Sequence, residues 1–176
     1  MQFEPTLVDG AFLVRMEPRL DERGLFARSF CAEEFQASGL PGQVVQCNVS
    51  FNSHRGTLRG MHYQRAPRPE GKLVRCTMGA ALDVIVDLRK ESPTYCRWVG
   101  AEISAENRLA LYVPPGVAHG FQTLVDGTEL FYQMTEYYVP QLADGVRWND
   151  RAFRIEWPIP DPILSARDAS YADFAV

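Results

Sequence analysis

The fold class is predicted most readily from the segment Leu73-Val-Arg-Cys-Thr-Met-Gly-Ala-Ala-Leu-Asp-Val-Ile-Val-Asp-Leu88. It contains two runs rich in apolar residues, 73–78 and 80–88, and Gly79 separates them as a turn residue. The part Val84-Ile-Val-Asp-Leu88 is almost continuously apolar, which predicts a strand in the centre of a sheet. Two short strands joined by a tight turn are therefore expected here.

Similar runs occur on both sides of this segment. They cover residues 43–51, 98–103, 109–113, 119–125 and 129–138, with turn-forming residues between them. Helical periodicity is convincing only over residues 32–39, where Gly39 and Pro41 end it. Short strands at a spacing of roughly ten residues predict an all-β sandwich, barrel or jelly roll with one short helix.

Length and composition agree with a single domain spanning residues 1–176. The chain is 46% hydrophobic, enough to bury a core, and its 13 glycines and 12 prolines are typical of a turn-rich all-β protein. The C-terminal tail from Trp148 onwards carries Pro158, Pro160 and Pro162. Proline interrupts regular structure, so we expect this tail to form neither strand nor helix and to wrap around the barrel.

Charge and targeting signals exclude several classes of function. A net charge of −4 is unfavourable for a nucleic-acid binder, which needs a basic face. No apolar stretch approaches the roughly 18 residues of a membrane span, and the N-terminus does not resemble a signal peptide. The four cysteines are widely spaced, which indicates neither a zinc site nor a disulfide framework. We therefore expect a cytoplasmic protein with no membrane or nucleic-acid partner.

The three histidines are His54, His62 and His119, and a metal site is the first specific idea to test. Mononuclear sites commonly use two histidines and a carboxylate. A set made of His62, His119 and one acid such as Glu70 fits poorly, because position 64, two residues after His62, is glutamine. The sequence therefore favours metal-free use of the imidazole.

Acid–base chemistry is the second idea. Tyr132 lies in a predicted strand, where alternation would place it on one face with Met134, Glu136 and Tyr138. A phenol beside a polar cavity can donate a proton. Taken alone, such a tyrosine is more often a core-edge residue with a hydrogen-bonded hydroxyl.

Several motifs in a fixed order extend these observations, and together they resemble one known family. They are Gly56-Thr-Leu-Arg-Gly-Met-His-Tyr-Gln64, Glu70-Gly-Lys-Leu-Val-Arg75, Asp83-Val-Ile-Val-Asp-Leu-Arg-Lys-Glu-Ser-Pro-Thr94, Pro114-Pro-Gly-Val-Ala-His-Gly-Phe121, Tyr137-Tyr-Val-Pro140, Trp148-Asn-Asp150 and Ser165-Ala-Arg-Asp168. With these motifs the chain resembles the dTDP-4-dehydrorhamnose 3,5-epimerases, from about Asp21 to Ser170.

The resemblance implies a fold, an assembly and an activity. It implies a cupin-type jelly roll, a homodimer with exchanged N-terminal strands, and no metal or organic cofactor. The family's substrate is a nucleotide-linked 4-keto-6-deoxy sugar. Its members epimerise carbons 3 and 5 by removing and returning protons next to the ketone, which suits a base on one face and an acid on the other.

The resemblance also implies roles for individual residues. His62 matches the family's base, and Asp168 the carboxylate that orients it. Lys72 matches the cation near the ketone oxygen, and Tyr132 the acid that returns a proton. The expected substrate contacts are Arg23, Gln46, Asn48, Arg59, His119, Tyr138 and Arg167, of which Tyr138 would stack on the base.

Two positions depart from the family pattern, and both concern the nucleotide. Arg28 and Ala143 stand where the family usually has glutamates, and Asp144 follows Ala143. Thymine presents an N–H that suits a carboxylate, whereas cytosine presents an acceptor that suits an arginine. Arg28 is therefore counted among the substrate contacts, with the hypothesis that a CDP sugar replaces the dTDP sugar.

Three interpretations remain open at this stage. The leading one is a cofactor-free 3,5-epimerase acting on dTDP-4-dehydro-6-deoxyglucose. A single-site epimerase or a keto-isomerase acting on a CDP- or GDP-linked sugar could use the same base and acid. A sugar-nucleotide-binding cupin without catalysis is the third, although His62, Tyr132 and Asp168 are all present.

Overall fold

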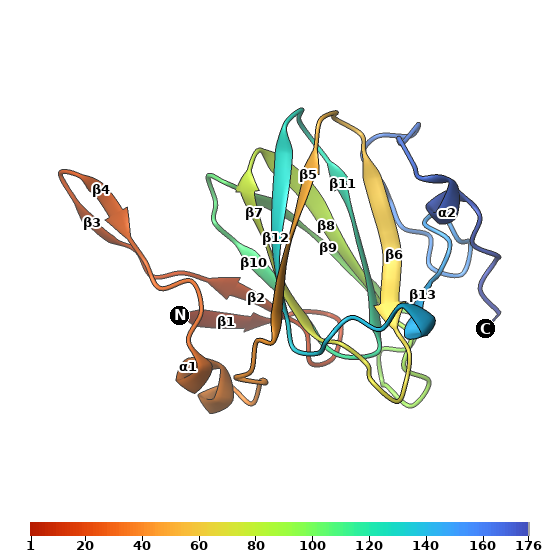
Figure 1. The fold of residues 1–176 in the computed structure, drawn as a ribbon, viewed down its shortest axis with the longest axis horizontal. Helices are drawn as coiled ribbons and strands as arrows, with labels where there is room; N and C mark the ends of the chain where they lie inside the picture. The colour runs from red at the N-terminus through yellow and green to blue at the C-terminus, as the bar shows by residue number, and fades with distance from the viewer. Residues whose placement is uncertain (176) are drawn as a thin grey trace.

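The computed structural model, which describes residues 1–175, consists mainly of two antiparallel β-sheets facing each other (Figure 1). In spatial order the larger sheet contains β1 (Gln2–Pro5), β2 (Phe12–Arg15), β10 (Ala110–Val113), β7 (Lys72–Met78), β12 (Thr128–Met134) and β5 (Gln46–Asn52). The smaller sheet contains β13 (Ala143–Gly145), β6 (Leu58–Gln64), β11 (Val117–Thr123), β8 (Ala80–Asp87) and β9 (Trp98–Ser104). The prediction of an all-β sandwich is confirmed.

Strand β8 is buried on both of its faces. Ile85 packs between the two sheets against residues such as Leu130, while Val84 and Val86 pack on the opposite side with Phe153 of the C-terminal tail. Val84, Ile85 and Val86 are all 0% exposed. The continuous apolar run therefore reflects a strand with the sandwich core on one side and the tail on the other.

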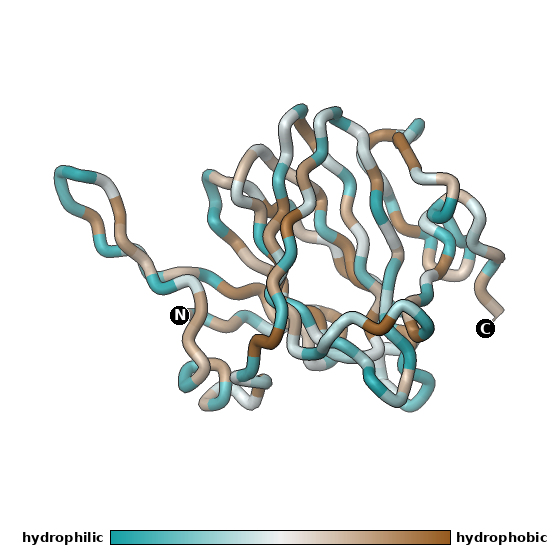
Figure 2. Tube along the Cα trace, viewed as in Figure 1, coloured by the Kyte–Doolittle hydropathy of each residue, from teal (hydrophilic) through white to brown (hydrophobic). Residues whose placement is uncertain are grey.

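Outside the two sheets lie short elements. They are α1 (Ala32–Ala37), the 3-10 turn η1 (Pro140–Leu142), α2 (Ala166–Ala169) and a hairpin of β3 (Arg19–Asp21) and β4 (Gly24–Phe26). The helix predicted over 32–39 is confirmed as α1. The hairpin projects from the body of the molecule and contains hydrophobic residues (Figures 1 and 2). Among these, Leu20 and Phe26 are largely exposed.

Three expectations about the elements are wrong. Residues 58–64 form strand β6, although this segment is not among the predicted strands. The strand expected over 129–138 ends at Met134, so Glu136 and Tyr138 lie in the following loop. The tail contains α2, which begins because Ser165 Oγ accepts a hydrogen bond from the Asp168 amide at 3.1 Å.

Gly60 of β6 and Gly120 of β11 allow these two strands to approach each other closely. A Cβ atom on Gly60 would lie 2.6 Å from the Gly120 Cα of β11, and one on Gly120 would lie 2.8 Å from the Arg59 carbonyl oxygen. The register between β6 and β11 shifts between His119 and Phe121 at this point. The glycines thus serve strand packing beside the site residues.

The C-terminal tail lies against the smaller sheet. Ile163 pairs with Thr57 in a parallel bridge, and the side chain of Gln122 exchanges hydrogen bonds with the backbone of Ile159. These contacts confirm the prediction that the tail wraps the barrel. The tail also places α2 in contact with β6. Within residues 1–175, no helix has the length and apolar character needed to cross a bilayer.

Candidate active site

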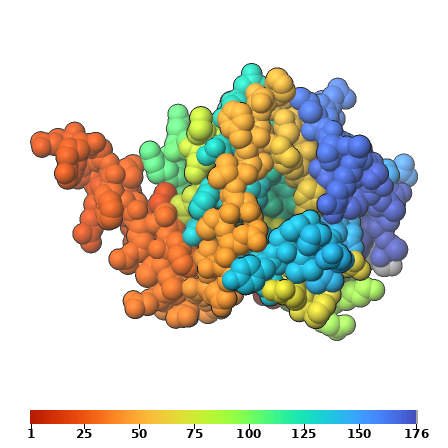
Figure 3. All heavy atoms as spheres, viewed as in Figure 1, coloured from red at the N-terminus to blue at the C-terminus, as the bar shows by residue number. Residues whose placement is uncertain are grey.

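A cavity of about 430 Å³ lies between the two sheets (Figure 3). It is lined by Gln46, Asn48, Val49, Ser50, Arg59, His62, Glu70, Lys72, His119, Phe121, Tyr132, Met134 and Tyr138. Strands β6 and β11 supply one wall, and β5, β7 and β12 supply the other. The cavity therefore brings together residues that are far apart in the sequence and that the motifs singled out.

His62 and Asp168 form a close pair at this cavity. His62 Nε2 lies 2.6 Å from Asp168 Oδ1, and the Asp168 side chain is only 5% exposed whereas that of His62 is 39% exposed. Helix α2 delivers the carboxylate to β6 from the tail. The imidazole of His62 is therefore accessible from the cavity, and the buried carboxylate of Asp168 fixes the orientation of the ring.

Asp168 is held in its ionised form. Its burial favours the neutral acid, but hydrogen bonds from His62, from the Ser165 hydroxyl and from the Gly60 amide outweigh that effect and lower its pKa below the ordinary value. An ionised Asp168 requires a proton on His62 Nε2. Nδ1 is then the ring nitrogen that is available as a base.

Lys72 begins β7 and is nearly buried. Its Nζ lies 2.9 Å from Glu70 Oε1, and the two side chains are 6% and 10% exposed. Glu70, considered above only as a metal ligand, thus neutralises the buried lysine. Since an ammonium group carries three donors, Lys72 keeps hydrogen-bonding capacity for a ligand in the cavity.

Tyr132 faces the cavity from β12, in the sheet opposite His62. Burial, followed by the negative charge of Asp83, raises the pKa of Tyr132 above its ordinary value. Its ring stands edge-on to that of His119, with 5.8 Å between the ring centroids. At neutral pH this phenol therefore carries its proton and can act as an acid.

His119 is paired with a carboxylate of its own. His119 Nε2 lies 2.6 Å from Asp83 Oδ1, and the side chains are 5% and 0% exposed. Register pairing places His119 directly opposite His62 on the neighbouring strand. The cavity wall formed by β6 and β11 thus presents two imidazoles, each with a buried aspartate.

Polar residues at the cavity mouth are held by further hydrogen bonds. Arg59 Nε donates to Asn52 Oδ1 at 2.8 Å, and Gln46 Nε2 donates to Asn48 Oδ1 at 3.2 Å. The loop after β12 is fixed by Gln64, whose Oε1 accepts from the Val139 amide at 2.8 Å. These contacts pre-organise the residues expected to meet the substrate.

A smaller recess adjoins the cavity and contains Arg167. It is lined by His62, Tyr63, Gln64, Glu70, Tyr138, Ala143, Asp144 and Arg167. Arg167 Nε donates to the Tyr171 hydroxyl at 3.0 Å, and Asp144 pairs with Arg65 at 3.3 Å. Ala143 therefore lies in the recess beside Arg167, an expected substrate contact. The neighbouring carboxylate of Asp144 already pairs with Arg65.

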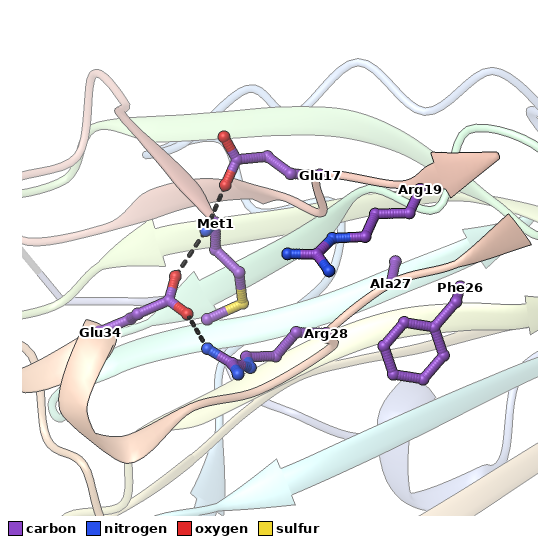
Figure 4. Close-up of a pocket in the computed structure, with 7 residues that line it drawn as sticks. All are labelled: Met1, Glu17, Arg19, Phe26, Ala27, Arg28 and Glu34. Carbon is purple, nitrogen blue, oxygen red and sulfur yellow. Dashed lines mark hydrogen bonds and ion pairs between the residues drawn. The ribbon is translucent and has the colours of Figure 1, made fainter.

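Arg23 and Arg28 lie outside this cavity within one chain. Arg23 is on the projecting hairpin and pairs with Asp21 at 2.5 Å. Arg28 Nη1 lies 2.7 Å from Glu34 Oε1, in a separate pocket beside Met1 and Glu17 (Figure 4). Within a single chain, Arg23 and Arg28 therefore do not line the cavity with the other expected substrate contacts.

Four supporting residues were not singled out as site residues from the sequence. Asn52, Glu70 and Asp83 each pair with a cavity residue, and Gln64 holds the loop of Tyr138. Asp83 had a recognisable signal, because it is a charged residue inside a strand predicted to be buried. Among residues 1–175, no three side chains of His, Cys, Asp or Glu are placed to hold a metal ion.

The chain is similar over nearly its whole length to one family of known proteins. Residues 5–175 match the family model described as dTDP-4-dehydrorhamnose 3,5-epimerase. The enzyme of that name from Shigella flexneri is 45% identical over 161 residues, which cover 90% of this chain and 88% of that protein. A dTDP-4-dehydrorhamnose 3-epimerase from Streptomyces niveus is 37% identical over 169 residues, covering 96% of this chain and 81% of that protein.

A solved structure supports the fold assignment. The crystal structure of dTDP-4-dehydrorhamnose 3,5-epimerase from Elizabethkingia anophelis superposes with a TM-score of 0.95 at 37% identity, covering 99% of this chain and 96% of that one. The predicted cupin-type jelly roll is confirmed by this similarity and by the two-sheet topology.

Proposed function

The chain belongs to the dTDP-4-dehydrorhamnose 3,5-epimerase family, and on this basis we propose how its cavity carries out the reaction. The chain is an isomerase that acts on a nucleotide-linked 4-keto-6-deoxy sugar. The proposed conversion is that of dTDP-4-dehydro-6-deoxyglucose to dTDP-4-dehydrorhamnose. Removing a proton from carbon 3 or carbon 5 leaves a charge that spreads onto the ketone oxygen, so the intermediate is an enolate.

The enolate needs a base, an acid and a stabilising cation. His62 accepts the carbon-bound proton, and Asp168 stabilises the resulting imidazolium through the 2.6 Å hydrogen bond. Lys72 donates to the ketone oxygen as its negative charge develops. Tyr132 returns a proton to the carbon from the opposite side, which inverts the configuration.

One observation carries this proposal above the others. The His62–Asp168 pair and Tyr132 lie on opposite walls of one cavity, because they come from the two facing sheets. Inversion requires proton removal on one face and delivery on the other. A non-catalytic binding protein has no need for this arrangement.

The test uses matched variants of the two walls. Tyr132→Phe keeps the ring but loses the acid, and we expect its product formation to fall by about 10²-fold or more because the enolate is not protonated from the opposite face. Conversion of dTDP-4-keto-6-deoxyglucose is followed by proton NMR. Product formation at the wild-type rate in Tyr132→Phe would reject the assignment of this acid.

The nucleotide is proposed to bind at the arginine-rich mouth of the cavity. Arg59 and Arg167 suit a diphosphate, since guanidinium groups pair with phosphate in bidentate fashion. Tyr138, which is 53% exposed at the junction of cavity and recess, suits stacking on the base. The relatives are named for dTDP sugars, which supports dTDP, and Arg28 is engaged by Glu34 instead of facing the cavity.

The hypothesis of another base has a direct test. Initial rates on dTDP-, CDP- and GDP-linked 4-keto-6-deoxyglucose are compared at equal concentrations. We expect the dTDP sugar to be used fastest, and a faster rate on the CDP sugar would restore the interpretation based on Arg28 and Ala143. Product structure in the same assay separates 3,5-epimerisation from single-site epimerisation and from keto-isomerisation.

A homodimer is proposed to complete the site. Leu20 and Phe26 on the projecting hairpin are 76% and 75% exposed. Exposure of such large apolar side chains to water is unfavourable, and a second copy of the chain would cover them. The exchange of N-terminal segments would also bring Arg23 to the partner's cavity. This arrangement explains why Arg23 resembles a substrate contact in sequence but lies outside the cavity of its own chain.

Mixed dimers of two inactive variants test the exchange. One chain carries His62→Ala and the other Arg23→Ala, so one of the two sites in the mixed dimer is intact if Arg23 crosses to the partner. Activity above that of either variant alone is expected. Activity no greater than the average of the two would place Arg23 at the site of its own chain or at none.

A cytoplasmic location is proposed as well. Cys31, Cys47, Cys76 and Cys96 are all free thiols, which suits a reducing compartment. Fractionation of the native cells with an antibody to the chain tests this location, and recovery in an extracytoplasmic fraction would contradict it.

A further inference from the structure

Gln64, at the end of β6, is a buried residue whose side-chain amide holds the backbone of two loops. Its Nε2 donates to the Arg68 carbonyl oxygen at 2.6 Å and to the Tyr137 carbonyl oxygen at 3.1 Å. Its Oε1 accepts from the Val139 amide at 2.8 Å, and the residue is only 2% exposed. Both donor hydrogens of the amide and its oxygen are therefore engaged by the protein itself.

The two loops, residues 65–71 and 135–139, also bind each other directly. The Thr135 amide donates to the Gly71 carbonyl oxygen at 2.9 Å, and the Gly71 amide donates to Thr135 Oγ1 at 2.8 Å. One loop leads from β6 into β7, and the other follows β12. The two loops therefore form one unit, and Gln64 joins them from the buried side.

Tyr138, the residue proposed to stack on the base, lies between two of these contacts. Gln64 binds the carbonyl of Tyr137 before it and the amide of Val139 after it. The amide of Tyr138 itself donates to Gln46 Oε1 at 3.3 Å. The backbone of Tyr138 is thus held on both sides, although the residue is 53% exposed. A backbone that is already ordered lowers the entropy cost of stacking a ligand on the ring.

We infer that Gln64 is a positioning residue for nucleotide binding, because it holds Tyr138 where the ring can stack on the base. This inference rests on the proposed function, in which the base binds at Tyr138. Gln64 acts through Tyr138, since its own polar atoms are occupied by backbone groups. Loss of these contacts should weaken nucleotide binding and leave proton transfer by His62 and Tyr132 largely intact.

Calorimetric titration of dTDP into the wild type and into Gln64→Met tests the inference. Methionine has a similar volume but no amide, so packing is retained while the hydrogen bonds to both loops are lost. If the loop then occupies the held position only about a tenth of the time, the Kd for dTDP rises about 10-fold. KM for the dTDP sugar should rise with it, while kcat changes less than about 3-fold. A wild-type Kd in Gln64→Met, or a fall in kcat at unchanged KM, would overturn the inference.

A double-mutant cycle tests whether Gln64 acts through Tyr138. Tyr138→Ala removes the ring, so the position of the loop no longer affects stacking. In that background we expect Gln64→Met to raise the Kd for dTDP by less than about 2-fold, since the two residues are coupled. The same rise of about 10-fold in both backgrounds would contradict a role that depends on Tyr138.

The matched control is Gln122→Met. Gln122 is a second buried glutamine, 0% exposed, and it exchanges hydrogen bonds of 2.8 and 3.0 Å with the backbone of Ile159 in the tail. It lines neither the cavity nor the recess. This variant should be less stable and yet keep the wild-type Kd for dTDP. An equal rise in Kd in both variants would mean general loosening of the fold and would overturn the inference.

Amide hydrogen exchange gives a readout that needs no ligand. We expect the amides of residues 135–139 to exchange faster in Gln64→Met than in the wild type, and to be unchanged in Gln122→Met. Wild-type exchange of this loop in Gln64→Met would contradict the inference. If Gln64→Met does not fold, Gln64→Glu replaces it with the same expectations, because glutamate keeps the size and the acceptor oxygen but loses both donors.

Failure of the proposed function remains distinguishable from failure of this inference, because binding of dTDP requires no turnover. A wild type that binds dTDP but does not convert dTDP-4-keto-6-deoxyglucose contradicts the proposed function alone. Equal Kd values for Gln64→Met and a wild type that does convert the sugar contradict the inference alone. A wild type that does not bind dTDP contradicts both.

Discussion

At the residue scale, the site depends on pairs in which a buried carboxylate holds either a histidine or a lysine. His62 with Asp168, His119 with Asp83, and Lys72 with Glu70 each join a cavity residue to a carboxylate that is 10% exposed or less. Buried carboxylates hold the cavity residues in fixed orientations and charge states before the substrate arrives. Such pre-organisation is what electrostatic stabilisation of an enolate requires.

The base assignment gives the first prediction at this scale. His62→Ala should lower turnover of the dTDP sugar by at least about 10²- to 10⁴-fold, the usual contribution of a general base. Turnover is measured by proton NMR of the sugar. His54→Ala is the matched control, because His54 is exposed in a loop outside the cavity, and it should retain wild-type turnover.

Most of the cavity residues could be predicted from the sequence, whereas their partners could not. Motif order identified His62, Lys72, His119 and Tyr132 because their spacing resembles a family. Asp83 escaped notice as a site residue, since its pairing with His119 depends on how β8 and β11 lie side by side. Contacts between distant strands leave no local pattern in the sequence.

At the element scale, β8 and its exit loop give a prediction about acid stability. Burial opposes ionisation of Asp87, but hydrogen bonds from Arg89, Ser92 and Thr94 outweigh it and lower the pKa of Asp87 to about 2. A carboxyl group whose pKa is lowered on folding stabilises the protein above its unfolded pKa, and the stabilisation is lost as pH falls through the folded value. This contribution amounts to about 2 kcal/mol at neutral pH.

Asp87→Asn should therefore lower the free energy of unfolding at pH 7 by about 2 kcal/mol and reduce its dependence on pH between about pH 4 and pH 2. Urea unfolding at a series of pH values measures both quantities. An unchanged dependence on pH in the variant would show that Asp87 is not the group responsible.

The close approach of β6 and β11 gives a second prediction at this scale. In Gly120→Ala the new Cβ would lie 2.6 Å from Met61 Sδ and 2.8 Å from the Arg59 carbonyl oxygen. Overpacking of this kind costs about 1–3 kcal/mol, and thermal unfolding measures it. Gly127→Ala is the control. A Cβ atom at Gly127 would have no other atom within 4 Å, so only the backbone φ of +65° disfavours alanine there.

The strand assignments illustrate which elements a sequence pattern can predict. Strands β7 and β8 were predicted because their apolar runs are continuous or alternate cleanly. Strand β6 was missed because Gly60 breaks its pattern, and the reason for that glycine is the neighbouring strand, which the sequence does not reveal. Helix α2 was missed because three prolines in the tail outweighed the Ser165 cap.

At the scale of the whole molecule, the proposed association of two chains rests on the exposed apolar residues of the projecting hairpin. Phe26→Asp with Leu20→Asp should weaken a dimer by placing charges in its interface, and sedimentation velocity should then detect monomers. Arg15→Ala is a suitable control, because it removes an exposed pair with Glu4 outside the hairpin. A wild-type chain that sediments as a monomer at micromolar concentration would contradict the proposed assembly.

The central claim is that His62 removes the protons flanking the ketone at both carbon 3 and carbon 5, and proton exchange tests it most directly. The wild-type protein and His62→Ala are each incubated with dTDP-4-keto-6-deoxyglucose in heavy water, and deuterium is located by NMR. We predict deuterium at both carbons with the wild type and at neither with His62→Ala. Deuterium at one carbon or none with the wild type, or equal incorporation by the variant, would contradict the claim.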